Sequence, residues 1–368
     1  MKILSIFGTR PEAIKMAPVV RELAKRPDVE SRVCVTAQHR EMLDQVLDLF
    51  DIKPDVDLNL MRPDQSLAGL TAAVFTHLDP VLAEIKPDWV LVQGDTTTVM
   101  AAALNAYYRR IRVGHVEAGL RTHNKWEPFP EEINRRVAGV AADLHFAPTK
   151  WSRQNLLKEG VPEELVHVTG NPVIDALYFV AEQPVPTMVA DLLSKYESKR
   201  IVLVTAHRRE NFGQPLEEIC AAIKSIAERD DVQIIYPVHL NPNVQGTVKR
   251  LLGNVPNVLL LRPLEYLPLV HLMKNADLIL TDSGGIQEEA PAFGVPVLVL
   301  RDVTERPEGV QSGTLKLVGT DAKKIVNEAN YLLNDRLAHA AMAQAVNPFG
   351  MGDSAQKIVD VLLRTGKA

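Results

Sequence analysis

The chain opens with Lys2-Ile-Leu-Ser-Ile-Phe7, which runs directly into Gly8-Thr-Arg10-Pro11-Glu12-Ala-Ile-Lys15. The first run is mostly apolar and lacks clean apolar–polar alternation, which favours a strand covered on both faces. Pro11 suits the first position of a helix, where its missing N–H needs no partner. This stretch therefore predicts a buried strand, a glycine turn and a helix, the opening unit of a parallel α/β fold.

The same order of strand, turn and helix recurs along the rest of the chain. Further strands are expected at 31–36, 89–92, 111–116, 144–147, 201–205, 233–238, 258–261, 278–281 and 295–300. Amphipathic helical segments are expected at 12–25, 97–109, 216–228 and 286–293. Repeated βαβ units of this kind predict a doubly wound α/β architecture.

The length of the chain indicates more than one domain. At about 150 residues per domain, 368 residues correspond to two domains or three. Thr169-Gly-Asn-Pro172 interrupts the pattern, so a domain boundary is expected near 168–172, before a second βα series. Two such domains facing each other would form a cleft at the carboxyl ends of their strands, where ligands of these folds bind.

The composition excludes several classes of protein. Hydrophobic residues make up 46% of the chain and charged residues 24%, the balance of a soluble globular protein. With 46 acidic and 41 basic residues, the net charge of −5 gives no global attraction to nucleic acid or to an anionic membrane. Cys34 and Cys220 lie far apart in apolar surroundings, which favours buried thiols over a disulfide framework. No Cys/His cluster has zinc spacing, and the first apolar run is too short for a signal peptide, so we expect a cytoplasmic protein.

Two cations stand at the start of the first predicted helix. Arg10 and Lys15 lie where the helix dipole is already positive, which costs about a few tenths of a kcal/mol each. A bound phosphate would reverse the sign of that cost. The alternative is a pair of solvated side chains. The dinucleotide fingerprint G-x-G-x-x-G is absent from this turn.

A second strand-to-helix turn has the sequence Asp282-Ser283-Gly284-Gly285-Ile-Gln-Glu-Glu289. Each glycine in a first helical turn costs up to about 1 kcal/mol relative to alanine. That cost has a reason if a phosphate approaches the backbone N–H groups closely, which favours a nucleotide diphosphate site. Glu289 could then accept hydrogen bonds from ribose hydroxyls. The alternative is a helix capped by Ser283, although the capping-box position is occupied by Ile286 rather than an acid.

Three acidic residues stand in turns near strands of the first half. Asp95 lies in Gln-Gly-Asp-Thr-Thr, Glu117 in Val-Glu-Ala-Gly-Leu-Arg and Glu131 in Pro-Glu-Glu-Ile-Asn-Arg. Asp95 has the alternative role of a helix cap, and Glu131 that of complementing a helix N-terminus. Glu117 directly follows a buried strand, where a carboxylate is desolvated unless it is paired. Together the three acids suit proton transfer on one bound substrate.

Histidines supply further candidates at strand ends. His207 ends the first strand of the second half, and the flanking Arg208 and Arg209 favour a site over a structural histidine. Gln38 and His39 follow the second predicted strand, and His239 has a similar position in the second half.

Taken together, these motifs resemble those of the bacterial non-hydrolysing UDP-N-acetylglucosamine 2-epimerases. The resemblance runs from Met1 to the last helix. The shared motifs, in the family's order, are Phe-Gly-Thr-Arg-Pro-Glu-Ala, Gln-Gly-Asp-Thr-Thr, Val-Glu-Ala-Gly-Leu-Arg, Pro-Glu-Glu-Ile-Asn-Arg, Thr-Ala-His-Arg-Arg-Glu-Asn and Asp-Ser-Gly-Gly-Ile-Gln-Glu-Glu. Such enzymes interconvert UDP-N-acetylglucosamine and UDP-N-acetylmannosamine for cell-envelope polysaccharides.

The resemblance implies a GT-B-like fold, with two Rossmann-like domains around a deep cleft, and a homodimer. It implies that the final helix, about 354–364, returns to the first domain, so the domains are expected at 1–168 plus 352–368 and at 169–351. The residues implied to hold UDP are Arg10, Lys15, Ser283, Gly284, Gly285, Glu289 and Arg306. The positions implied to be catalytic are Asp95, Glu117, Glu131 and His207. A regulatory UDP-sugar site beside the active site would include Gln38, His39, Arg208 and His239, so the substrate would also act as an activator. No cofactor and no metal are implied.

The expected mechanism begins at C1 of the sugar, because the C2 proton is not α to a carbonyl. Expulsion of UDP gives C1 oxocarbenium character and acidifies C2, and loss of the C2 proton gives 2-acetamidoglucal. UDP then adds back while a proton arrives on the opposite face, so more than one acid/base group is needed. Closure of the domains would keep water from the intermediate.

Two other functions compete with this interpretation. A glycosyltransferase can share the fold, since fold does not fix function. A non-catalytic UDP-sugar sensor would need only the nucleotide-binding residues and leaves Asp95, Glu117 and Glu131 unexplained. An NAD-dependent epimerase is disfavoured by the absent dinucleotide fingerprint.

Overall fold

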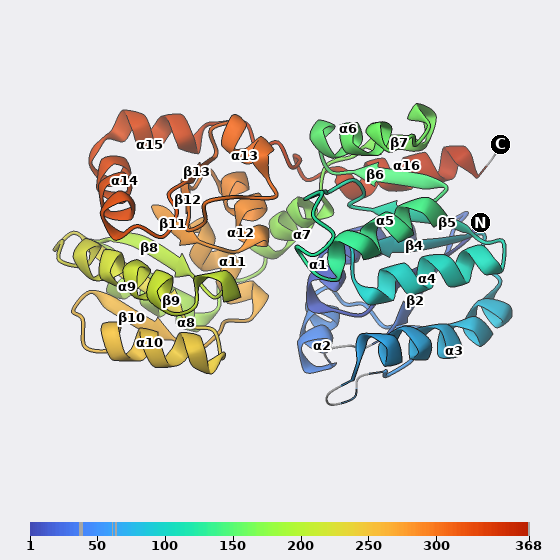
Figure 1. Ribbon diagram of the computed structural model, residues 1–368, viewed down its shortest axis with the longest axis horizontal. Helices are drawn as coiled ribbons and strands as arrows, with labels where there is room; N and C mark the ends of the chain where they lie inside the picture. Colours follow the sequence, from blue (N-terminus) through green and yellow to red (C-terminus); the bar gives the residue numbers. More distant parts are fainter. Residues whose placement is uncertain (37–39, 61, 63–64, 367–368) are drawn as a thin grey trace. The chain divides into compact units, whose positions relative to one another are not determined.

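The computed structural model describes residues 1–36, 40–60, 62 and 65–366. The chain divides into two compact units, here called unit 1 (Met1–Ala176 with Phe349–Ala368) and unit 2 (Leu177–Pro348). Each unit contains one parallel sheet with helices packed against it (Figure 1). The two Rossmann-like units confirm the predicted α/β class. The division falls within a helix, beyond the break expected near 168–172.

The sheet of unit 1 has seven strands in the order β3-β2-β1-β4-β5-β6-β7. The strands are β1 (Lys2–Phe7), β2 (Glu30–Val35), β3 (Val56–Asp57), β4 (Trp89–Gln93), β5 (Arg112–Val116), β6 (Leu144–Ala147) and β7 (Val166–Val168). The helices are α1 (Arg10–Ala24), α2 (Arg40–Leu49), α3 (Leu67–Ile85), α4 (Thr97–Tyr108), α5 (Glu131–Ala141), α6 (Lys150–Lys158), α7 (Pro172–Ala181, which continues into unit 2) and α16 (Ser354–Thr365). Leu4 and Ile6 pack in one core cluster with α3 and α4, and their neighbours Ile3 and Phe7 are also fully buried. Strand β1 is thus covered on both faces, as its sequence predicts.

The sheet of unit 2 has six strands in the order β10-β9-β8-β11-β12-β13. The strands are β8 (Arg200–Thr205), β9 (Val232–Pro237), β10 (Val258–Leu261), β11 (Leu278–Thr281), β12 (Val297–Val299) and β13 (Leu315–Leu317). The helices are α8 (Thr187–Lys195), α9 (Gln214–Ile226), α10 (Pro242–Leu252), α11 (Tyr266–Lys274), α12 (Gly284–Glu289), α13 (Pro307–Gln311), α14 (Ala322–Asn334) and α15 (Arg336–Ala343). Because β8 and β11 are neighbours, the loops that follow them meet at the same edge of the sheet.

Helix α16 returns to unit 1 and packs against α1 (Figure 1). The carboxylate of Asp175 accepts the backbone N–H groups of Ser354 (3.2 Å) and Ala355 (2.9 Å), which otherwise lack helical partners. Arg26, two residues after the end of α1, forms an ion pair with Asp360 of α16 at 2.9 Å. The last helix is therefore held at its start and along its length.

Aspartates bind main-chain N–H groups where neighbouring strands begin. The carboxylate of Asp88 accepts the N–H of Lys2, that of Asp143 the N–H of Val113, and that of Asp277 the N–H of Ile201, each at 2.7 Å. Each aspartate stands directly before a strand and bonds to the strand beside it. These contacts tie the amino ends of adjacent strands together in both sheets.

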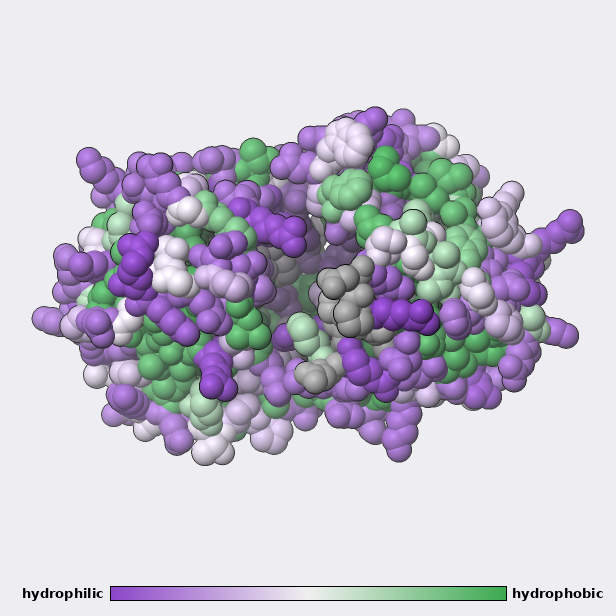
Figure 2. Space-filling view, turned by 60° about the horizontal axis from the view of Figure 1, so that its bottom comes forward, coloured by the Kyte–Doolittle hydropathy of each residue, from purple (hydrophilic) through white to green (hydrophobic). Residues whose placement is uncertain are grey.

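The surface and the interior separate as the composition predicts. Hydrophilic residues cover most of the face in Figure 2, with apolar groups scattered among them. Cys34 and Cys220 are buried and unbonded to each other, and burial raises the pKa of both thiols to about 12. In the described ranges, every helix is too short or too polar to span a bilayer.

Two local predictions at helices are wrong. Helix α1 begins at Arg10, so Pro11 is its second residue rather than its first. The segment expected to be one helix at 286–293 is α12 followed by a 3₁₀ helix, Ala290–Phe293. Pro291 explains the change, because it has no N–H to continue the α-helical hydrogen bonds.

Candidate functional site

Glu117 lies at the centre of a buried polar network at the carboxyl end of β5. Its side chain forms an ion pair with Lys15 of α1 and accepts a hydrogen bond from the amide of Gln93, the last residue of β4. The amide of Asn171, just before α7, donates at 2.9 Å to Oε1 of Glu117, the oxygen that also pairs with Lys15. The prediction that the desolvated carboxylate of Glu117 must be paired is confirmed. The backbone of Glu117 has φ of +62°, a strained conformation that residues of functional sites often retain.

Asp95 belongs to the same network and does not cap the following helix. Thr96 is the N-cap of α4, and its hydroxyl accepts the N–H of Val99 at 3.3 Å. Asp95 instead forms an ion pair with Arg135 of α5. Burial raises the pKa of Asp95, and the nearby Glu117 adds to that rise, while Arg135 and Lys15 oppose it. A raised pKa brings the carboxyl closer to holding a proton at neutral pH.

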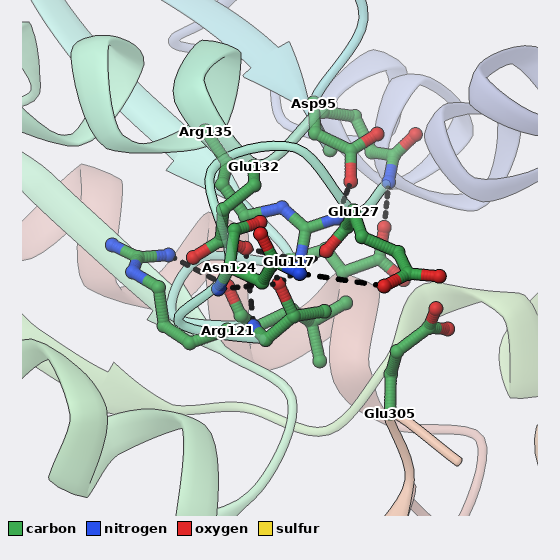
Figure 3. A network of polar contacts seen from close by, with 12 residues as sticks. Asp95, Glu117, Arg121, Asn124, Glu127, Glu132, Arg135 and Glu305 are labelled. Atoms are coloured by element: carbon green, nitrogen blue, oxygen red, sulfur yellow. Dashed lines mark hydrogen bonds and ion pairs between the residues drawn. The ribbon is translucent and has the colours of Figure 1, made fainter. Parts of the chain in front are cut away.

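Arg135 connects this network to the loop before α5 (Figure 3). It lies 3.4 Å from Glu132, whose carboxylate also accepts the backbone N–H groups of Thr122 (3.1 Å) and His123 (3.2 Å). Glu131 is the first residue of α5, and its Oε2 atom is buried. Glu131 thus lies where a carboxylate complements the dipole of a helix N-terminus, which is one of the two roles considered for it. This position also permits a catalytic role.

The first turn of α1 holds a buried carboxylate, that of Glu12, beside the two cations. Glu12 accepts the backbone N–H groups of Gly8 (3.1 Å) and Thr9 (2.7 Å) and the hydroxyl of Thr96 (2.8 Å). This is a capping box with Thr9 as N-cap, and burial raises the pKa of Glu12. Since Lys15 is paired with Glu117, the cost that we assigned to an unneutralised Lys15 at the helix start is offset within unit 1.

In unit 2, the loop after β8 is built on a single buried carboxylate. Asp282 follows β11 and accepts the backbone N–H groups of His207 and Arg208, each at 2.8 Å, and the amide of Asn211 at 3.0 Å. The ring of His207 stacks on the ring of His239, with 5.2 Å between centroids and 13° between planes. These contacts bring two of the predicted histidines together.

The glycine turn has a structural role that the sequence did not reveal. A Cβ atom at Gly284 would lie 2.9 Å from the guanidinium of Arg306, so a larger residue there would displace that guanidinium from its present position. Arg306 is held by Glu288 and Glu305, each at 2.7 Å. Gly285 has more room, because its nearest neighbour, Oε2 of Glu289, would be 3.6 Å from an added Cβ. The hydroxyl of Tyr266 donates to Glu289 at 2.6 Å.

The predicted residues thus gather in two groups, one in each unit. Asp95, Glu117 and Lys15 share a network in unit 1, with Glu131 at the start of the helix that supplies Arg135. In unit 2, His207 and Arg208 lie in the loop after β8, and His239, after β9, stacks on His207. Ser283, Gly284, Gly285 and Glu289 lie at the turn and helix after β11, and Arg306, just before α13, reaches that turn. Gln38 and His39 lie outside the described residues. Within the described residues, no three His, Cys, Asp or Glu side chains are grouped as a metal ion requires.

Several residues of these networks were missed by sequence reasoning, namely Glu12, Gln93, Glu132, Arg135, Asn171 and Asp282. A signal existed for two of them. Thr9-x-x-Glu12 is a capping-box pattern, and Asp282 opens the glycine turn directly after a buried strand. Asn171 was interpreted only as part of a domain break.

Comparison with known proteins agrees with this geometry. The family model described as UDP-N-acetylglucosamine 2-epimerase matches residues 21–363. The UDP-N-acetylglucosamine 2-epimerase of Escherichia coli K12 is 56% identical over 369 residues, covering 98% of each chain.

Two solved structures extend the comparison to the fold. The Neisseria meningitidis UDP-GlcNAc 2-epimerase bound to UDP-GlcNAc matches with a TM-score of 0.92 and 50% identity, covering 99% of this chain and 100% of that one. The Methanocaldococcus jannaschii UDP-GlcNAc 2-epimerase in complex with UDP-GlcNAc and UDP matches with a TM-score of 0.82 and 35% identity, over 99% of this chain and 100% of that one. The family match includes parts of both units and every motif described above except the first, at 7–15, and the chain belongs to the UDP-N-acetylglucosamine 2-epimerase family.

Proposed function

We propose that this protein interconverts UDP-N-acetylglucosamine and UDP-N-acetylmannosamine by inverting C2, without releasing free sugar and without a redox cofactor. The observation that carries the proposal is the buried network of Asp95, Glu117 and Lys15 in a chain that matches this family over almost its whole length. The Neisseria relative, at 50% identity, binds UDP-GlcNAc, which supports a UDP-sugar as the substrate.

The reaction begins with cleavage of the C1–O bond, in which the electron pair leaves with the diphosphate oxygen of UDP. A carboxylate takes the proton from C2, and the C1–C2 double bond of 2-acetamidoglucal forms. UDP then adds back to C1 while a second group delivers a proton to the other face of C2. Two faces require at least two proton-transfer groups, and Asp95, Glu117, Glu131 and His207 are the candidates. The raised pKa of Asp95 supports its use as a group that holds a proton.

The UDP portion is held, in this proposal, by Arg10, Lys15, Ser283, Gly284, Gly285, Glu289 and Arg306. Cations and backbone N–H groups near the diphosphate stabilise the charge that develops on UDP as it leaves. The contacts of Arg306 with Glu288 and Glu305 fix the guanidinium beside the glycine turn.

A regulatory role for a second UDP-sugar is part of the proposal. Arg208 follows His207 in the loop after β8, His239 stacks on His207, and Gln38 and His39 complete the candidate set. The Methanocaldococcus relative, which holds both UDP-GlcNAc and UDP, supports a family able to bind two such ligands. We further propose a cytoplasmic homodimer that supplies cell-envelope polysaccharide synthesis.

The test is proton NMR of the purified protein with UDP-N-acetylglucosamine in D₂O, without added metal or nicotinamide. We expect UDP-N-acetylmannosamine with deuterium at C2. Free N-acetylmannosamine with UDP would instead identify a hydrolysing enzyme. A substrate that binds and stays unchanged would contradict the proposal and favour a transferase or a sensor.

The same assay tests the acid/base groups through Asp95→Asn, Glu117→Gln and Glu131→Gln. Each substitution keeps the size of the side chain and removes its ability to exchange a proton, so the turnover number should fall by about 10²–10⁴-fold. Asp79→Asn, in a surface ion pair with Arg109, is the matched control and should keep full activity. Full activity in all three site variants would exclude the acid/base assignment.

A further inference from the structure

Asp282 is a fully buried carboxylate at the carboxyl end of β11. One oxygen, Oδ2, accepts hydrogen bonds from the backbone N–H groups of His207 and Arg208 and from the amide of Asn211. That oxygen accounts for the shape of the loop after β8. It leaves the second oxygen, Oδ1, to be explained.

Oδ1 of Asp282 is buried and accepts no hydrogen bond from the described residues. A polar atom stands near it, because Nδ1 of His207 is 3.4 Å away. A buried carboxylate oxygen without a donor carries the full cost of desolvation, so a proton on Nδ1 is favoured at this position. In ligand-free active sites such catalytic hydrogen bonds are often long and tighten when substrate binds.

The ring of His207 is otherwise held by its neighbours. His239 covers one face in a stacked arrangement, and the side chain of His207 remains 36% exposed. The charged and titratable groups that act on it are Asp282, His239 and Arg208. Burial lowers the pKa of His207, and His239 and Arg208 lower it further, while Asp282 opposes them.

We infer that Asp282 is a positioning residue that keeps the proton of neutral His207 on Nδ1. Nε2 is thereby left to exchange a proton or a hydrogen bond with the bound substrate. When Nε2 is protonated, the carboxylate of Asp282 stabilises the imidazolium. The same logic applies where a buried aspartate orients a catalytic histidine through Nδ1 in hydrolases. The inference rests on the proposed function for the part that concerns turnover, but the pairing of Asp282 with His207 is a separate claim.

The discriminating variant is Asp282→Asn. Its side-chain oxygen can still accept the three N–H bonds that Oδ2 accepts, so the loop should keep its shape. Its amide N–H₂ then faces Nδ1 of His207, which must become an acceptor, and the proton moves to Nε2. We expect ¹⁵N NMR of labelled imidazole to show this change of tautomer.

Turnover should change in a way that a purely structural residue would not cause. For Asp282→Asn we expect kcat to fall on the order of 10²–10⁴-fold with a smaller change in KM, the upper value being that of the comparable aspartate in serine proteases. The limb of the pH–rate profile that belongs to His207 should move to lower pH, because loss of a nearby negative charge lowers the pKa of an imidazole.

The matched control is Asp277→Asn, at the opposite end of the same strand. Asp277 also binds a backbone N–H of β8, that of Ile201, but precedes β11, at the end of the strand opposite to Asp282 and His207. This variant should keep the wild-type tautomer, kcat and pH profile. A double variant, His207→Asn with Asp282→Asn, should be no slower than His207→Asn alone, because Asp282 acts through His207.

Wild-type kcat and an Nδ1–H tautomer in Asp282→Asn would overturn the inference. So would an Asp282→Asn loss that persists in full in the His207→Asn background. If the wild-type protein fails to epimerise, the proposed function fails, and the tautomer comparison between wild type and Asp282→Asn still decides the pairing.

Discussion

Two buried histidines lie on neighbouring strands of the unit 1 sheet, near the carboxylate network. His115 of β5 and His145 of β6 are directly paired across the parallel strands, and both are 1% exposed. Nε2 of His115 is 2.7 Å from the carbonyl of Gly94, at the turn that carries Asp95. Burial lowers the pKa of His115 to about 4 and that of His145 to about 3. Both are therefore neutral in the folded protein at neutral pH.

This neutrality makes stability depend on pH. An unfolded histidine binds a proton near pH 6.5, whereas folded His145 does so only near pH 3. The unfolded state thus binds more protons in this window, and the free energy of unfolding falls as pH decreases, by up to about 1.4 kcal/mol per pH unit for each such histidine. His145→Gln should show a shallower decline between pH 6 and pH 4 in urea unfolding. His77→Gln, on an exposed face of α3, should match the wild type, and equal slopes in all three proteins would refute the assignment.

Residue patterns predicted that Glu117 needs partners, but they did not predict which ones. The amide of Gln93 is available because Gln93 and Val116 are opposite each other in the parallel pair β4–β5. Asn171 arrives from more than fifty residues away, so no local pattern connects it to Glu117. Turn chemistry and burial are local properties, whereas the composition of a polar network depends on strand order.

At the scale of elements, long apolar runs were easy to recognise and short edge strands were not. Each predicted strand is present, with ends shifted by at most two residues. The missed strands β3, β7 and β13 contain two or three residues each, too few to show a period. The return of α16 to unit 1 came from the family resemblance and not from any pattern in the helix itself.

Helix α16 should contribute strongly to the stability of unit 1. Leu362 is fully buried, and its side chain lies near Gly114 of β5. Leu362→Ala removes this packing and should lower the free energy of unfolding by roughly 2–5 kcal/mol. Gln356→Ala, on the exposed face of the same helix, should change it by less than about 0.5 kcal/mol. Chemical denaturation of the two variants makes the comparison, and equal effects would show that α16 is loosely attached.

At the scale of the whole molecule, the two units differ in how the chain builds them. Unit 2 is continuous, and its core cluster is drawn entirely from residues between Val202 and Leu333. Unit 1 is discontinuous, because α16 returns after unit 2 is complete. A continuous unit with its own core meets the requirements for independent folding.

We therefore expect a fragment of residues 172–348, which keeps α7 whole, to fold alone and to unfold cooperatively when followed by circular dichroism. A fragment of residues 1–176 lacks the buried side chains of α16 and should be much less stable or aggregate. A gradual thermal transition with dye-accessible apolar surface in the 172–348 fragment would contradict the expectation.

The aspartates at the two ends of β11 have a consequence for strand length. Strands β8 and β11 are joined at both ends, by Asp277 to the N–H of Ile201 and by Asp282 to the N–H of His207. Because both of these hydrogen-bonded joints must form, the lengths of β8 and β11 between them are fixed relative to each other. Removing one residue from either strand would leave only one joint able to close and would turn the following side chains to the opposite face. Natural insertions and deletions in this sheet should therefore be confined to the loops beyond the two joints.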